Sequence, residues 1–93
     1  MIQSFKTAMT QEVFEGRTPR RFPADLVSVT RRKLAQLDAA SVLEDMRVPP
    51  GNRLEALSGD RAGQHSIRVN DQYRICFTWG AHGPEEVEFV DYH

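Results

Sequence analysis

The residues best suited to chemistry are two arginines, Arg68 and Arg74, on either side of the short polar segment 70–72. The stretches around that segment alternate apolar and polar residues, which is typical of antiparallel strands with one buried face. Val69 and Tyr73 both belong to the apolar series, and a three-residue connection brings them opposite each other. The same register places Arg68 directly across from Arg74.

Two guanidinium groups directly across a ladder repel each other, so this register requires compensation. Carboxylates on the same face are one source of it, and Glu55, Glu86 and Glu88 have the parity to lie there. A phosphate bound between the two arginines is the other. Alternation alone leaves both explanations open.

The residues Asp91, Tyr92 and His93 follow the last predicted strand. A histidine in such a position is commonly just exposed to solvent. It can also reach over the polar face of the sheet, where an imidazole is suited to proton transfer near neutral pH. Both alternatives remain open from the residues alone.

The elements that position these groups change character near Gly51. Before it, apolar residues recur at helical spacing, and after it they alternate. This order predicts a single α+β domain, residues 1–93, with N-terminal helices packed on one face of a small antiparallel sheet. We expect helices at residues 7–15 and 23–39, and strands at residues 1–5, 53–57, 64–69, 73–79 and 86–90.

Composition restricts the function further. The 93 residues contain no apolar run approaching the roughly 20 residues of a membrane span, and the N-terminus lacks a signal-peptide pattern, so we expect a cytoplasmic protein without membrane contact. One cysteine excludes an internal disulfide, and His65 and His82 lack companions at metal-ligand spacing, so no metal or cofactor is expected. Arginine supplies ten of the 12 basic residues and suits bidentate phosphate contact, although the net charge of −1 argues against bulk coating of nucleic acid.

Three motifs occur in order along the chain: Leu-x-Gly-Asp-Arg-x-Gly at residues 57–63, Arg-Ile-x-Phe at residues 74–77, and Asp-Tyr-His at residues 91–93. Together they resemble the RelE/ParE toxin superfamily, and within it the HigB toxins, over essentially the whole chain. The resemblance implies a RelE-like fold and ribosome-dependent cleavage of messenger RNA by a metal-independent endoribonuclease. It also implies partners: the 70S ribosome with its message, and a cognate HigA-type helix-turn-helix antitoxin.

The resemblance also implies roles for particular residues. Arg68 and Arg74 match arginines that hold the scissile phosphate and neutralise its developing charge. Glu55 lies where relatives have a general base that accepts the 2′-hydroxyl proton. His93 matches a histidine that protonates the leaving 5′-oxygen, and Tyr92 matches an aromatic that stacks on a base or orients the phosphate.

Further contacts to RNA are implied for Arg53, Arg61 and Asp91, although Arg61 could instead simply hold its loop in place. Ser58 is a departure, because relatives often carry a lysine there that contacts phosphate. Two other functions therefore stay open at this point: a ParE-like toxin that binds DNA gyrase, and a catalytically weak antitoxin-binding protein that acts in operon regulation.

Overall fold

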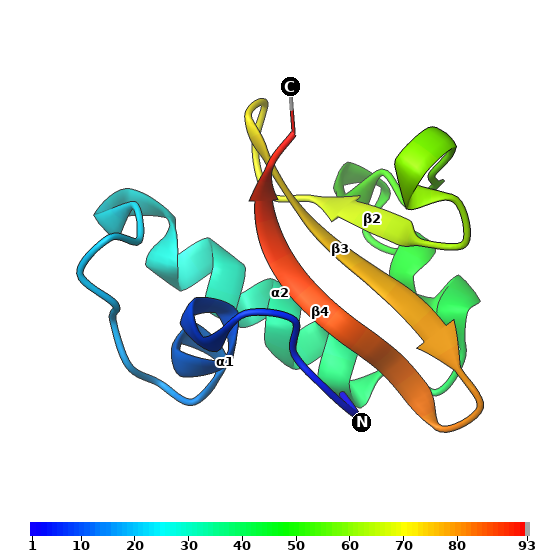
Figure 1. The fold of residues 1–93 in the computed structure, drawn as a ribbon, viewed down its shortest axis with the longest axis horizontal. Helices are drawn as coiled ribbons and strands as arrows, with labels where there is room; N and C mark the ends of the chain where they lie inside the picture. The colour runs from blue at the N-terminus through cyan, green and yellow to red at the C-terminus, as the bar shows by residue number, and fades with distance from the viewer. Residues whose placement is uncertain (93) are drawn as a thin grey trace.

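A computed structural model describes residues 1–92 of the chain, and His93 lies outside the described residues. The centre of the fold is a four-stranded antiparallel sheet with the strands in sequence order (Figure 1). Short connections between consecutive strands favour this meander, as the alternation after Gly51 predicted. The strands are β1 (Glu55–Ala56), β2 (His65–Arg68), β3 (Tyr73–Gly80) and β4 (Gly83–Asp91).

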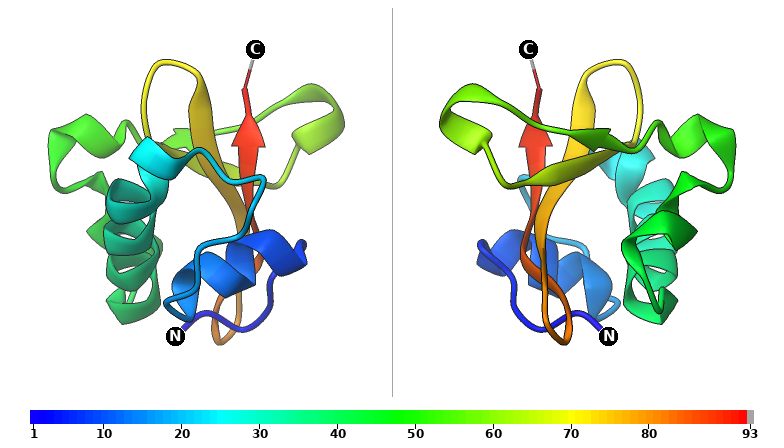
Figure 2. Two further views of the ribbon diagram at one scale, coloured as in Figure 1. Left: turned by 90° about the vertical axis from the view of Figure 1, so that its left-hand side faces the viewer. Right: turned by 90° about the vertical axis from the view of Figure 1, so that its right-hand side faces the viewer.

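Two α-helices precede the sheet, as expected. In α1 (Ala8–Phe14), the Thr7 side chain accepts a hydrogen bond from the backbone of Thr10, and Gly16 follows with a left-handed φ of 95°. The second predicted helix is confirmed as α2 (Val27–Ala39), with its first turn formed separately as a 3-10 helix (Ala24–Leu26). Figure 2 shows α2 covering one side of the sheet, with α1 crossing near its lower end.

The core lies between α2 and the apolar face of the sheet. Ile67 and Ile75 pair across β2 and β3 and are fully buried, and so are Leu34 and Leu37 from α2. Phe89 continues this face along β4, with its ring 4.4 Å from that of Phe22 and 4.6 Å from that of Tyr73. Burying these side chains supplies most of the stabilisation of a chain this small.

The predicted strand at residues 1–5 is wrong, because only Phe5 forms a bridge, parallel to Val87 of β4. Glu86 has a φ of 52°, and the register shifts between Cys76 and Thr78, so this part of β4 is irregular. The N-terminal segment nevertheless satisfies the outer edge of β4. Ser4 O accepts from Val87 N at 3.1 Å, and Thr10 Oγ1 accepts from Phe89 N at 3.0 Å.

Two of the later strands differ from expectation by more than one residue at an end, whereas β2 and β3 differ by at most one. The predicted strand 53–57 shrinks to Glu55–Ala56, because Arg53 adopts a left-handed conformation with φ 46° and cannot continue a ladder. The predicted strand 86–90 extends back to Gly83, since Pro84 on an edge strand has no N–H that needs a partner. No helix within residues 1–92 combines the length and apolar character needed to cross a bilayer.

Candidate active site on the outer face of the sheet

The sheet face that points away from α2 carries the predicted chemistry, and we call it the outer face. The predicted register is confirmed: Arg68 of β2 pairs directly with Arg74 of β3. Ser66 and Cys76 form the next pair on the same face, and Glu55 of β1 lies opposite Ser66. The outer face is defined by Glu55, Ser66, Arg68, Arg74, Cys76 and Glu88.

Arg74 is the most constrained of these side chains, with only 8% of its surface exposed. Its Nε donates to Ser66 Oγ at 2.7 Å, and its Nη2 donates to the Arg53 carbonyl at 2.7 Å and to the Ser66 carbonyl at 3.5 Å. These three acceptors belong to β2 and to the segment before β1. They hold the guanidinium in one orientation while leaving its Nη1 toward Glu55.

Two exposed side chains flank this guanidinium. Glu55 Oε1 lies 3.6 Å from Arg74 Nη1, and the Glu55 side chain is 53% exposed. The Tyr92 ring centroid lies 5.6 Å from Arg74 Cζ, within the range of a cation–π contact. The outer face thus places a fixed cation, an accessible carboxylate and a phenol together.

The chain's last described residues are held beside the β2–β3 turn, as Figure 1 shows near the C-terminus. Tyr92 N donates to Gln72 O at 2.8 Å, and Gln72 Nε2 donates to Asp91 Oδ2 at 3.0 Å. These contacts explain how Tyr92, which directly follows β4, reaches Arg74 of β3. His93, the predicted proton donor, lies outside the described residues.

The repulsion between Arg68 and Arg74 is compensated by carboxylates on two different segments. Glu55 pairs with Arg74, as one of the three predicted candidates, and Asp71 in the turn pairs with Arg68. Glu88 faces other cations, and Glu86 lies exposed in the irregular part of β4. Asp71 was missed because only its place in the turn, and no strand alternation, brings it to Arg68.

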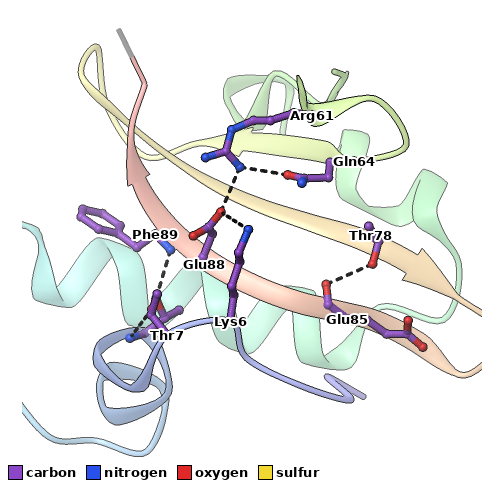
Figure 3. A network of polar contacts seen from close by, with 9 residues as sticks. Lys6, Thr7, Arg61, Gln64, Thr78, Glu85, Glu88 and Phe89 are labelled. Carbon is purple, nitrogen blue, oxygen red and sulfur yellow. Dashed lines mark hydrogen bonds and ion pairs between the residues drawn. The ribbon is translucent and has the colours of Figure 1, made fainter. Parts of the chain in front are cut away.

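A second polar cluster joins Arg61, Glu88 and Lys6, and Figure 3 shows the three side chains meeting over β4. Arg61 Nη1 donates to Glu88 Oε1 at 2.9 Å and to Gln64 Oε1 at 3.0 Å, whereas Lys6 Nζ lies 3.8 Å from the same carboxylate. The hydrogen bond to Glu88 raises the pKa of Arg61. Arg61 therefore holds the 3-10 turn Gly59–Arg61 against the sheet.

Replacing Arg61 by alanine is expected to destabilise the protein by about 1–3 kcal/mol, because it leaves the largely buried Glu88 carboxylate without its close partner. Lys6→Ala is the matched control. Its side chain is 53% exposed and contacts the same carboxylate at longer range, so its loss should cost at most about 1 kcal/mol. Urea unfolding at neutral pH compares the two. Equal midpoint shifts would contradict the anchoring role of Arg61.

Sequence patterns missed one contributor to the site. Ser66, fully buried, supplies an acceptor to Arg74, and the only signal was its parity on the outer face between His65 and Ile67. Cys76 is also fully buried on this face, and burial raises the pKa of its thiol. Within residues 1–92 there is no grouping of three or more His, Cys, Asp or Glu side chains placed to hold a metal ion.

Comparisons with known proteins agree with this architecture. In the solved structures, the YoeB–YefM complex from Staphylococcus aureus contains a chain with a TM-score of 0.62 at 17% identity, covering 100% of this chain and 98% of that one. A YoeB/ParE toxin from Agrobacterium tumefaciens gives a TM-score of 0.57 at 19% identity, covering 98% and 99%. These likenesses show that the chain shares its fold with those two structures.

Sequence similarity identifies the family more closely. Toxin HigB-1 of Vibrio cholerae is 42% identical over 80 residues, which cover 85% of this chain and 84% of that protein. Endoribonuclease HigB of Proteus vulgaris is 30% identical over 93 residues, the full length of both. The family model described as "RelE-like toxin of type II toxin-antitoxin system HigB" matches residues 3–93. The chain therefore belongs to the HigB-like toxins of type II toxin–antitoxin systems.

Proposed function

We propose that this toxin is an endoribonuclease that cleaves messenger RNA on the ribosome without a metal ion. The observation that carries the proposal is the arrangement around Arg74: a guanidinium held by Ser66 and the Arg53 carbonyl, with Glu55 at 3.6 Å and the Tyr92 ring at 5.6 Å. A fixed cation is suited to charge that develops on a phosphate during reaction. The name of the Proteus vulgaris relative supports the same activity.

In the proposed reaction, the 2′-oxygen of the RNA attacks the adjacent phosphorus and the bond to the 5′-oxygen breaks. Glu55 accepts the 2′-hydroxyl proton, and its exposure leaves it open to the incoming RNA. Arg74, through Nη1, and Arg68 neutralise charge on the nonbridging oxygens. The products are a 2′,3′-cyclic phosphate and a free 5′-hydroxyl.

The C-terminal residues complete the proposed site. The exposed ring of Tyr92 is available to stack on a base next to the scissile phosphate. His93, which follows it in sequence, is proposed to protonate the departing 5′-oxygen. Arg53 and Asp91 are proposed as RNA contacts at the rim, and Arg61 as a contact secondary to its pairing with Glu88.

As a type II toxin, the protein has an antitoxin partner. We propose that this partner is a helix-turn-helix protein of the HigA kind. Binding of this partner to the folded toxin would stabilise the toxin by mass action. The apparent unfolding temperature of the toxin would therefore rise as the concentration of free antitoxin increases.

The test uses purified toxin, 70S ribosomes and a defined message, with the same message free of ribosomes as the control. We expect cleavage only on the ribosome, and end mapping should give 2′,3′-cyclic phosphate and 5′-hydroxyl termini. These ends report the chemistry without removing the magnesium that ribosomes need. Ends carrying 3′-hydroxyl and 5′-phosphate would contradict the proposed reaction.

Intact message in the presence of folded toxin would overturn the nuclease proposal. Growth arrest with DNA-damage signalling would then identify a gyrase-directed toxin. Absence of growth arrest with retained antitoxin binding would identify a protein that acts only in operon regulation.

A further inference from the structure

A buried polar network behind the site connects α2 to Arg74, and the proposed chemistry does not use it. Its centre is Asn52, which is fully buried at the end of the 3-10 turn Pro50–Asn52. Asn52 Oδ1 accepts from Lys33 Nζ at 2.6 Å. Its Nδ2 donates to the carbonyls of Met46 at 3.1 Å and Val48 at 3.3 Å, and to Gln36 Oε1 at 3.3 Å.

Lys33 is an unusual residue for this position. It lies in the buried stripe of α2, and burial, with Arg32 and Arg68 nearby, lowers the pKa of its ammonium. Among residues 1–92 it has no carboxylate within ion-pair distance, and its partner is the Asn52 amide oxygen. Burying an ammonium without a carboxylate is more costly than burying an apolar side chain of the same size. What the ammonium provides is a fixed orientation for the Asn52 amide.

Arg53, the residue after Asn52, links this network to the outer face. Arg53 has φ 46° and ψ 56°, a left-handed conformation that non-glycine residues rarely adopt. Such a conformation persists where the surrounding structure holds it in place, and the anchored Asn52 side chain is adjacent. The Arg53 carbonyl then accepts from Arg74 Nη2 at 2.7 Å.

We propose that Lys33 and Asn52 are positioning residues for Arg74: they hold the backbone at Arg53 so that its carbonyl orients the guanidinium toward the RNA. This inference rests on the proposed nuclease function. The sequence alone indicated Arg74 as a site residue. The residue that anchors its support, Lys33, lies on α2 at the other side of the sheet. Small displacements of a catalytic group cost large factors in rate.

The test compares Lys33→Met and Asn52→Ala with wild type in ribosome-bound cleavage. We expect kcat to fall about tenfold or more while KM changes less than about threefold, because the RNA contacts themselves remain. Val13→Ala, a fully buried position in α1 away from the network, is the control for lost stability and should leave kcat within about twofold. All variants are measured at a temperature where circular dichroism shows them folded.

A second readout follows Arg74 directly and needs no cleavage. In nitrogen-15 spectra, the wild-type Arg74 side chain should show slow exchange of its Nε proton and separate Nη signals, and both variants should lose these features. If Asn52→Ala does not fold, Lys33→Met carries the comparison, since it removes only the ammonium at similar volume. Averaged Nη signals in wild type, or unchanged signals and kcat in Lys33→Met, would overturn the proposal.

The two readouts separate this inference from the proposed function. Altered Arg74 signals in a protein whose wild type cuts no message would contradict the nuclease function and leave the positioning role standing. An active wild type, together with variants whose kcat and Arg74 spectrum are unchanged, would contradict the positioning role and leave the nuclease function standing.

Discussion

Replacing Arg74 by alanine is expected to reduce cleavage of ribosome-bound message by about 100-fold to 1,000-fold and to abolish growth arrest. Loss of a preorganised donor to a developing oxyanion commonly has an effect of this size. Here the guanidinium is also the group on which Glu55 and Tyr92 converge. The measurement is single-turnover cleavage of a defined message, together with growth of cells that express each variant.

Arg74→Lys is the matched control, because it keeps the charge and removes the planar set of donors. A lysine cannot reproduce both the bond to Ser66 Oγ and the bond to the Arg53 carbonyl, so we expect it to recover only a small part of the activity. Retained antitoxin binding and a cooperative unfolding transition show that each variant is folded. Cleavage by the alanine variant within about threefold of wild type would exclude Arg74 from the chemistry.

Phe77→Ala should produce the largest loss of stability among single changes. The Phe77 side chain is fully buried, with ring centroids of His65 at 6.5 Å and Trp79 at 6.4 Å. Truncating a buried phenylalanine typically costs about 3–5 kcal/mol, out of a total of about 5–15 kcal/mol for a small domain. A domain of this size should therefore unfold about 12–40 °C lower, or require its antitoxin to stay folded.

Thermal and urea unfolding followed by circular dichroism measure this effect. Val42→Ala is the control, since Val42 is 53% exposed and its truncation should change stability by less than about 0.5 kcal/mol. Equal midpoints for the two variants would mean that Phe77 does not belong to the core as described.

Local periodicity was enough to predict the pair of arginines at the centre of the candidate site. Alternation on both sides of residues 70–72, with an odd connection, set Arg68 across from Arg74, and the structure confirms that pairing. Residues 7–15 and 23–39 were likewise predicted as helices, because helical spacing and end signals are local features of the sequence. Their positions on one side of the sheet followed from the order of the elements.

Partners of the charged groups could not be predicted in the same way. Alternation put Glu55, Glu86 and Glu88 on one face, and could not show that Glu55 meets Arg74 whereas Glu88 meets Arg61. That choice depends on the irregular register in β4 and on where the short strand β1 begins. The failed strand at residues 1–5 has the same origin, since the isolated backbone hydrogen bonds that Gln3, Ser4 and Lys6 make to β4 leave no mark in local sequence.

The sequence by itself determined the order of helices and strands, the register of the β2–β3 hairpin and the family to which the toxin belongs. Only the tertiary structure decided what holds Arg74: the Arg53 carbonyl lies 21 residues away along the chain, and Glu88 lies 27 residues from Arg61. The physical reason is one of range. Periodicity reports which face a side chain takes relative to its neighbours, whereas contacts across the sheet depend on packing of segments that local patterns do not link.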